Sequence, residues 1–322
     1  MQTFPESINS TESTEYSIVR LSKDNLNDIS RLHAVVYDTT VRHDYFQKKY
    51  NTAYTGLEYI GFIAYNHKAI PIAYYGVIPC FIQYGNKTIL AAQSADTMTH
   101  PQYRYKGMFV ELSNRAFDLC RQLGIRLIFG FPNQNSYHGA VSKLGWKMTG
   151  TMTCFTIPIK ALPLEAAFKK MKLWQLYKKY CGYILRKKIL PFEGISNSVI
   201  TDAFAGVHRN GDYLNYKIYS SSKVIAIDNV KVWIKLEQGL LIGDIKGINK
   251  KNFNGVIIQL KKIAVLLGLR KIQFHCSYGT SLHQLFATTY QPTPSFPVLF
   301  QDFGSGIPLE KIKFTFADID IF

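Results

Sequence analysis

The chain has few cysteines, and they are not spaced as metal ligands are. Its 322 residues include five cysteines, an odd number, and these are scattered without a C-x-x-C pair or a His/Cys cluster. Zinc-binding modules and disulfide scaffolds depend on such spacings. The sequence therefore predicts no metal site and no disulfide framework, and it indicates a reduced, intracellular protein.

Long apolar runs are also missing. The stretch VIIQLKKIAVLLG is interrupted by Lys261 and Lys262, and nowhere do roughly 18 apolar residues follow one another, as a transmembrane helix requires. The first residues are polar and slightly acidic, without the basic start and apolar run of a secretory signal. We therefore expect a cytoplasmic protein, either free or at the inner face of the membrane.

Acidic residues are scarce as well. The chain has 22 Asp and Glu against 38 Lys and Arg residues, which gives a formal net charge of +16 and a pI near 9.5. Such a charge attracts nucleic acid, anionic lipid, CoA and nucleotide-sugars alike. No zinc finger, ribonucleoprotein aromatic signature or helix-turn-helix spacing is present, so no specific nucleic-acid partner is predicted.

Apolar periodicity in the first half alternates between that of strands and that of helices. The first helix has Asp24 as its N-cap, and a later one begins at Met108 and ends at Gly124. The apolar face of the first helix carries Leu26, Ile29, Leu32, Val35 and Val36. Strands are predicted over 16–22, 59–66, 70–84, 88–99 and 125–131 and as a pair within 147–159, and further helices over 41–50 and 136–144. The order βααβββαβαββ predicts an α/β (α+β) fold with a mixed sheet and helices on both faces.

Part of this pattern recurs in the second half. QLGIRLIF (122–129) resembles LLGLRKIQF (266–274), and each follows an amphipathic helix. A β-hairpin around Gln238-Gly239 and a helix over 252–268 restore the βαβα order, which indicates an internal repeat. The alternative is that helix-glycine-strand transitions in α/β proteins look alike by chance. We predict a polar tail, a first domain, a linker helix and a second domain, over 1–14, 15–160, 161–195 and 196–322.

The predicted linker is basic and amphipathic. Residues 168–188 contain eight Lys and Arg residues and no acidic residue, together with Trp174 and three tyrosines. A helix at the surface of an anionic membrane has this composition. So does an interdomain helix whose apolar stripe packs on the domains while its lysines stay solvated, and both interpretations remain open.

The segment His100–Phe117 carries the strongest functional signal. A turn between a strand and a helix aims several backbone N–H groups at one point, beside the positive end of the helix dipole, and Gly107 lets an anion approach the backbone closely. This loop resembles the Arg/Gln-x-x-Gly-x-Gly/Ala motif of the GNAT N-acyltransferases. The matching residues are Arg104, Tyr105, Lys106, Gly107, Met108 and Phe109. Phe109 departs from the motif, which usually has Gly or Ala there.

Two neighbouring segments extend the resemblance over nearly the whole first half. SADTMTHP resembles the family strand that pairs with the pantetheine arm of CoA, which implies contacts from Thr97, Met98 and Thr99. FPNQNSYHGAVSKLGW resembles the second family motif. The matching residues there are Asn133, Asn135, Ser136 and the Gly145-Trp146 pair. The resemblance implies a mostly antiparallel GNAT sheet, a second degenerate GNAT-like domain, and acetyl-CoA as the acyl donor.

The family mechanism implies direct attack of a neutral amine on the thioester. A backbone N–H near Met98 would hold the oxyanion, and a tyrosine would protonate the leaving thiolate. Val141 stands where this tyrosine is usual, so Tyr137 is the substitute, with an aromatic packing role as the alternative. Asp96 is either the general base or a structural carboxylate. His100 is interpreted as a turn element.

These observations favour a tandem GNAT N-acyltransferase. It would transfer acetyl, or a longer acyl group, to a primary amine such as an amino-sugar on a nucleotide or lipid carrier. The final residues, FTFADIDIF, resemble those of GNAT-like proteins of bacterial surface-polysaccharide synthesis, while NKKNFNG replaces the donor loop in the second half. The alternatives are a Fem-like transferase that uses aminoacyl-tRNA and a non-catalytic module that binds CoA or another ligand.

Overall fold

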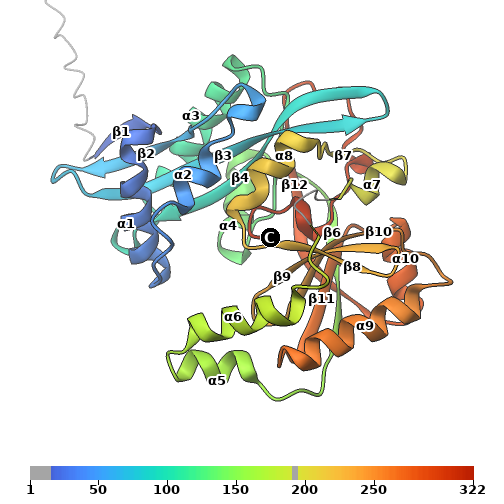
Figure 1. Cartoon of the computed structure of the whole chain (residues 1–322). Helices are drawn as coiled ribbons and strands as arrows, with labels where there is room; N and C mark the ends of the chain where they lie inside the picture. Colours follow the sequence, from blue (N-terminus) through green and yellow to red (C-terminus); the bar gives the residue numbers. More distant parts are fainter. Residues whose placement is uncertain (1–15, 191–194) are drawn as a thin grey trace, which may run out of the picture.

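The computed structural model describes residues 16–190 and 195–322 (Figure 1). The predicted tail 1–14 and residues 191–194 of the predicted linker lie outside the described residues. The strands are β1 (Tyr16–Arg20), β2 (Ile60–Asn66), β3 (Pro71–Tyr84), β4 (Lys87–Thr99), β5 (Leu127–Gly130), β6 (Lys147–Pro158), β7 (Gly206–Val207), β8 (Lys223–Ile227), β9 (Val230–Leu236), β10 (Leu240–Lys246), β11 (Lys271–Cys276) and β12 (Pro292–Asp302). The α-helices are α1 (Leu26–Tyr37), α2 (Tyr45–Tyr50), α3 (Met108–Gln122), α4 (Gln134–Leu144), α5 (Leu164–Lys170), α6 (Trp174–Leu185), α7 (Ser198–Thr201), α8 (Gly211–Tyr216), α9 (Phe253–Leu266) and α10 (Ser281–Ala287).

All the strands belong to one sheet. Its order is β1-β2-β3-β4-β5-β12-β6-β11-β10-β9-β8, with β7 paired to β3 at the side. Among the strands that the structure describes, only the pairs β4·β5 and β10·β11 are parallel. The predicted fold class, a mixed and mostly antiparallel sheet with helices, is thus confirmed.

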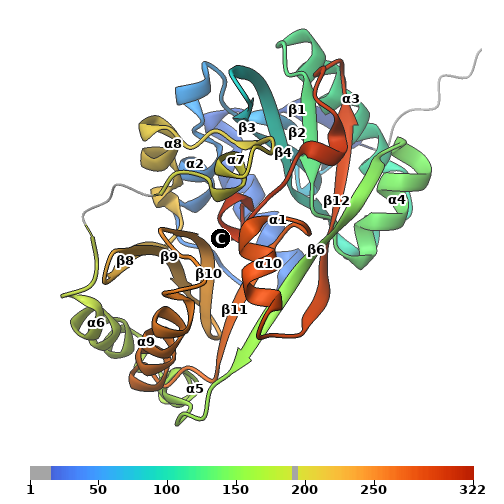
Figure 2. The same ribbon diagram turned by 90° about the vertical axis from the view of Figure 1, so that its right-hand side faces the viewer.

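The two sequence halves exchange their last strands. β6, from the first half, lies between β11 and β12, and β12, from the second half, lies between β5 and β6. Figure 2 shows β6 and β12 side by side where the two halves meet. Each half also has a helix, α3 or α9, between its two parallel strands and a shorter helix, α4 or α10, after them. The pairing pattern of the two halves is therefore equivalent.

Helices cover both faces of the sheet in the first half. Neighbouring residues of β3 belong to different cores: Tyr74 packs with α1 and α2, and Tyr75 packs with α3 and α4. In the second half, α6, α9 and α10 cover one face, while the C-terminal segment 312–322 packs into the other. All five cysteines are buried and unpaired.

Four local predictions were wrong. Asp24 does not cap α1, because Ser22 and Asn25 close a 3-10 turn first and α1 begins at Leu26. Val35 is exposed, because only Leu26, Ile29 and Leu32 of the apolar face of α1 are buried. The helix predicted over 41–50 covers Tyr45–Tyr50 only. The predicted strand pair within 147–159 is the single strand β6, because β12 and β11 pair along its length.

The predicted linker helix is broken in two. Lys172 has a φ of 59° and separates α5 from α6. The break lets both helices reach the second half: Leu164 packs over Gly268, and the Tyr177 hydroxyl donates to the carbonyl of Leu267 at 2.9 Å. The packing interpretation thus holds for the inward stripe of this segment.

One half-buried histidine, His275, predicts a pH dependence of stability. Burial, and secondly the charge of Lys271, lowers the pKa of His275 from 6.5 to about 4. Because the folded state binds fewer protons than the unfolded state between these values, the free energy of unfolding should fall as the pH falls from 6.5 to 4, by at most about 3 kcal/mol. In urea titrations at both ends of this range, His275→Gln should lose less stability than the wild type. The exposed control His138→Gln should behave as the wild type. An equal loss in His275→Gln would contradict the assignment.

Candidate functional site

The parallel strands β4 and β5 pair over a short distance only. Their paired residues are Ala91–Gln93 with Leu127–Phe129, and β5 ends at Gly130. β4 continues to Thr99, hydrogen-bonded to β3 on its other side. The edge of β4 that faced β5 is therefore not paired with a strand beyond Gln93. The predicted residues Thr97, Met98 and Thr99 lie on this part of β4.

A bulge in β4 falls at Asp96. This residue has a φ of 50°, and the register with β3 shifts between Tyr74 and Gly76. Ala95 and Met98, three residues apart, consequently face the same core with α1 and α2, although a regular strand would place them on opposite faces. The Asp96 carboxylate points to α2, as its contacts show below.

The loop after β4 turns sharply into α3. His100 stabilises its start, because its Nδ1 accepts a hydrogen bond from the amide of Gln102 at 3.3 Å. This agrees with its interpretation as a turn element. Tyr105 and Gly107 both have left-handed backbone, with φ of 66° and 81°. The side chains of Arg104, Tyr105 and Lys106 are exposed.

Several amides of this loop are open. Within the described part of the chain, the amides of Tyr105, Gly107, Met108 and Phe109 have no acceptor. The first intrahelical bonds come only from Val110 and Glu111, which donate to the carbonyl of Gly107. Amides at a helix N-terminus, together with the helix dipole, stabilise an anion such as a phosphate. A surface groove lies beside this loop, lined by Tyr16, Ser17, Asn66, His67, Gln102, Tyr103 and Lys106.

The equivalent loop of the second half, before α9, is closed by its own side chains. Asn249 Oδ1 accepts from the amides of Lys251 and Asn252 at 2.9 and 3.3 Å. Asn252 Oδ1 accepts from the Asn249 amide at 2.7 Å, and the Phe253 amide donates to the Asn249 carbonyl. The amides of Asn249, Lys251, Asn252 and Phe253 thus already have protein acceptors. Among the described residues, the amides of Asn254 and Gly255, in the first turn of α9, have none.

Phe109 fits its unusual place in the motif because Gly139 makes room for it. A Cβ on Gly139 would lie 2.9 Å from the Phe109 ring, so the ring packs against α4 where any other residue would collide. The ring also contacts Tyr75 edge-on. The bulky side chain is thus directed into the core with α3 and α4.

The predicted residues at the start of α4 have a structural use. Asn133 caps the helix, since its Oδ1 accepts from the amides of Asn135 and Ser136 at 3.0 and 3.1 Å. These two amides are therefore engaged within the protein. The side chain of Asn135 is exposed.

Asp96 belongs to a buried charge cluster that the sequence did not reveal. Its Oδ2 accepts from the Tyr50 hydroxyl at 2.8 Å and pairs with Lys49 Nζ at 2.7 Å. Lys49 Nζ also pairs with Asp320 Oδ2 at 2.8 Å. The other carboxylate oxygen of Asp320, Oδ1, accepts a hydrogen bond from the Gln93 side chain. Burial disfavours the charge of Lys49, which is 1% exposed, but the two carboxylates outweigh it and hold its pKa well above the ordinary value. Among the described residues, no donor contacts Asp96 Oδ1.

Tyr137 lies on the other face of the sheet. It packs with the α3 and α4 core, and its hydroxyl donates to Met148 Sδ at 3.1 Å. The Asp96 carboxylate contacts Tyr50 of α2, so the side chains of the two predicted catalytic residues lie on opposite faces of the sheet. Val141, at the usual tyrosine position, is 37% exposed.

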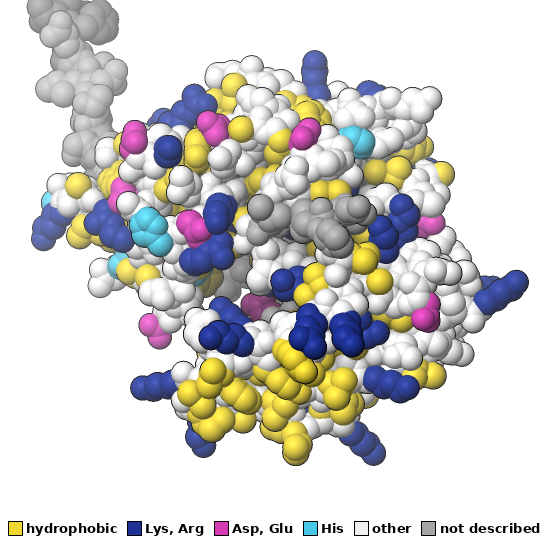
Figure 3. Space-filling view, in the orientation of Figure 1, with side chains coloured by type: hydrophobic (Ala, Val, Ile, Leu, Met, Phe, Trp, Pro, Cys, Tyr) yellow, Lys and Arg dark blue, Asp and Glu magenta, His cyan; other side chains and the backbone are white. Residues whose placement is uncertain are grey.

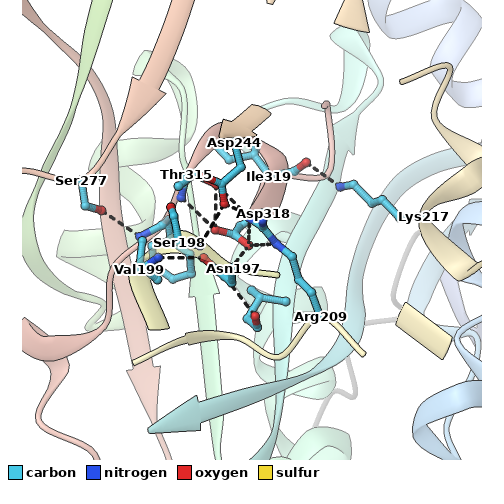
Figure 4. A network of polar contacts seen from close by, with 12 residues as sticks. Asn197, Ser198, Val199, Arg209, Lys217, Asp244, Ser277, Thr315, Asp318 and Ile319 are labelled. Carbon is cyan, nitrogen blue, oxygen red and sulfur yellow. Dashed lines mark hydrogen bonds and ion pairs between the residues drawn. The ribbon is translucent and has the colours of Figure 1, made fainter. Parts of the chain in front are cut away.

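A second buried charge network ties the C-terminal segment to β10 (Figure 4). Arg209, which is fully buried, pairs with Asp244 at 2.6 Å and with Asp318 at 2.7 Å. Asp244 follows a bulge in β10, as Asp96 lies at the bulge of β4. Here, however, the Phe322 ring sits over the backbone, 2.4 Å from where a Cβ on Gly243 would be. The bulge of the second half is therefore packed over.

The comparisons with known proteins agree with this geometry. Residues 17–149, less than half of the chain, match the family described as an acetyltransferase (GNAT) domain. No curated protein matched the chain.

Solved structures share the whole fold. A putative acetyltransferase from Pyrococcus horikoshii has 12% identity and a TM-score of 0.56, covering 97% of this chain and 96% of that one. A probable N-acyltransferase from Enterococcus faecalis has 12% identity and a TM-score of 0.58, over 90% and 73% of the chains. A GCN5-related N-acetyltransferase from Kribbella flavida has 11% identity and a TM-score of 0.54, over 89% and 72%. At these identities the likeness shows a GNAT-like fold.

The Lys49 cluster predicts that Asp320 stabilises the junction of the halves. Asp320→Asn leaves the buried ammonium with one carboxylate, which should lower the free energy of unfolding by about 2 kcal/mol. Asp118→Asn breaks an exposed pair with Arg121 and should cost less than about 0.5 kcal/mol. Chemical denaturation measures both. When Lys49 is already replaced by Met, Asp320→Asn should lower the free energy of unfolding by less than it does in the wild type. An equal loss of stability in Asp320→Asn and Asp118→Asn would contradict the role of the cluster.

Proposed function

We propose that this protein is an acyl-CoA-dependent N-acyltransferase that transfers acetyl from acetyl-CoA to a primary amine. The observation that carries the proposal is the set of four open amides at Tyr105, Gly107, Met108 and Phe109, next to the unpaired edge of β4. The open amides form a site for a diphosphate, and the unpaired edge of β4 offers backbone hydrogen-bond partners for an amide-containing arm. CoA has both groups.

Donor binding uses backbone atoms for contact and side chains for charge. The exposed Arg104 and Lys106 flank the open amides and add positive potential. Thr97, Met98 and Thr99 supply the unpaired β4 edge for the pantetheine arm, and Asn135 adds an exposed side chain at the start of α4. Gly107 has a left-handed backbone that would strain a residue with a side chain. Because glycine has no side chain, the diphosphate can approach the backbone closely.

One donor site per chain follows from the contrast between the two loops. Asn249 and Asn252 occupy the amides that would otherwise face a diphosphate in the second half. In this proposal the second half completes the sheet and supplies Asp320 to the acceptor side. The chain is then a tandem protein with one active half.

Catalysis needs a base for the amine and an acid for the thiolate. Asp96 is the base in this proposal: Tyr50 and Lys49 fix its Oδ2, which leaves Oδ1 to accept the proton. Tyr137 is the acid, after its hydroxyl leaves Met148. The amide near Met98 stabilises the oxyanion.

The acceptor in this proposal is an amino-sugar on an anionic nucleotide or lipid carrier, as in surface-polysaccharide synthesis. The net charge of +16 attracts such carriers, and the Asp96 carboxylate, whose Oδ1 has no donor among the described residues, suits an ammonium group. A non-catalytic CoA-binding module is the second candidate, because Val141 replaces the usual tyrosine and the Tyr137 hydroxyl already has a partner.

Binding of the donor is tested by thermal shift. At a concentration of about 100 times the dissociation constant, both acetyl-CoA and desulfo-CoA should stabilise the wild type by about 2.7 kcal/mol. Gly107→Asp should abolish the shift, since it places a carboxylate among the open amides. Gly279→Asp is the matched control, because Gly279 has nearly the same φ, 86° against 81°, and equally open surroundings.

Two outcomes would reject the donor site. One is the absence of a shift with either ligand, and the other is an equal loss of the shift in both glycine variants. Tight, salt-sensitive binding of tRNA without CoA affinity would favour the Fem-like alternative.

Catalytic roles are tested by thiol release with a panel of free and nucleotide-linked amino-sugars. Asp96→Asn and Tyr137→Phe should each lower kcat by about 10²- to 10⁴-fold while CoA still shifts the melting temperature. The controls Asp118→Asn and Tyr278→Phe change exposed residues and should leave kcat unaltered. If CoA binds but no amine releases thiol, the protein is a binding module.

A further inference from the structure

Large apolar side chains remain in solvent on the outward side of α5, α6 and the end of α9. Leu162 is 77% exposed, Leu176 52% and Tyr183 61%. Figure 3 shows apolar side chains gathered at the lower end of the molecule, where α5 and α6 lie, with Lys and Arg around them. We call this surface the helical patch, and it comprises Leu162, Met171, Leu173, Leu176, Tyr183, Val265 and Leu266.

Contacts between the helices make the patch continuous. The Tyr180 hydroxyl donates to the carbonyl of Leu266 at 2.7 Å, which holds α6 against the end of α9. The carbonyl of Leu162 lies 2.7 Å from where a Cβ on Gly268 would be. Residues from three separate segments thus meet on one surface.

The exposed charges of residues 160–190, which carry most of the patch, are all of one sign. The nearby exposed Glu237 pairs with Lys235 at 2.6 Å. Seven basic side chains are exposed around the patch: Lys169, Lys170, Lys172, Lys178, Lys179, Arg186 and Lys187. Glu165 is the sole acidic residue between 160 and 190, and it is buried and bonded to Lys169 and to the amide of Gln238. Several cations stand over aromatic rings, including Lys169 over Trp174 at 4.8 Å and Arg186 over Tyr183 at 4.4 Å.

α6 is apolar on two sides. Tyr177, Cys181 and Leu185 pack into the core of the second half. Leu176, Lys179 and Tyr183, spaced i, i+3 and i+7, follow one another on the outward side. The core therefore accounts for only one apolar side of α6. On the other side the apolar residues Leu176 and Tyr183 face solvent, with Lys179 between them.

We propose that the helical patch docks the protein on an anionic lipid surface. A bilayer with anionic headgroups offers negative charge above an apolar interior, which complements both the basic rim and the apolar centre. Each exposed Lys or Arg near such a surface strengthens binding by about fivefold. A second copy of the chain fits less well, since a symmetric contact would place lysines against lysines. No described helix has the length and apolar character needed to cross a bilayer, so the contact is peripheral. This inference does not depend on the proposed acyl transfer.

The test is co-sedimentation of the whole protein with vesicles of phosphatidylcholine, with or without phosphatidylglycerol. The wild type should bind the mixed vesicles, bind pure phosphatidylcholine at least about tenfold more weakly, and lose binding as salt rises. A triple variant with Leu173→Ser, Leu176→Ser and Tyr183→Ser should bind mixed vesicles at least about tenfold more weakly, although its charge is intact.

Charge variants separate local attraction from the overall charge of the protein. Lys172→Gln with Lys178→Gln and Lys179→Gln should also weaken binding at least about tenfold. The control neutralises three exposed lysines at the other end of α9, by Lys246→Gln, Lys250→Gln and Lys251→Gln, and should retain most of the binding. Unchanged melting temperatures would show that all variants are folded, as expected for exposed positions.

Three results would overturn the proposal. The first is equal loss of binding in the patch variants and in the control, which would mean diffuse charge attraction. The second is no binding of mixed vesicles by the wild type at low salt. The third is self-association of the wild type, in sedimentation velocity, that the Ser triple variant abolishes while vesicle binding stays unchanged, because the patch would then bind a second copy.

Discussion

Backbone pairing between the sequence halves fixes the relative position of every part of the site. β5 has β12 as its neighbour and β11 has β6, so each half closes the sheet edge of the other. Without this exchange, both strands would leave unpaired amides and carbonyls inside the molecule, which is costly. The exchange also brings the C-terminal segment against β4, where Asp320 reaches Lys49 from a position 271 residues away. The candidate site therefore combines a donor loop from the first half with a carboxylate from the end of the chain.

The equivalent positions of the two halves differ in what satisfies their polar groups. Gly107 and its neighbours offer no side chain that accepts their amides, whereas Asn249 and Asn252 accept each other's amides before α9. At the bulges, no donor from residues 16–190 or 195–322 contacts Asp96 Oδ1, whereas Asp244 is buried against Arg209 and the adjacent Gly243 lies under Phe322. Local hydrogen bonding is thus enough to explain why the described residues satisfy most amides of the loop before α9 but leave four amides open around Gly107.

Local pattern predicted those parts of the structure that local physics decides. The apolar stripe from Met108, the turn at Gly107 and the hairpin at Gln238-Gly239 all follow from neighbouring residues, and the structure has them. The strand exchange and the Lys49 cluster join residues far apart in sequence, and no periodicity encodes such partners. The break at Lys172 could not be predicted from the sequence, because no Gly or Pro marks it. It follows from tertiary packing, since Leu164 of α5 and Tyr177 of α6 both contact the end of α9.

Basic residues of the chain gather at two surfaces to which we assign different partners. At the loop around Gly107, Arg104 and Lys106 accompany open amides, so in the proposed function the charge there serves one small anion held in a defined geometry. Around the helical patch, basic side chains surround leucines without any arrangement of acceptors or amides, and a flat, adaptable anionic surface is the partner that such a rim suits. An acceptor carried on a lipid would bring the two together, because docking through α6 would hold the enzyme at the surface where its substrate is anchored. Free amino-sugars would gain nothing from the patch, and so its loss should affect turnover of a lipid-linked acceptor alone.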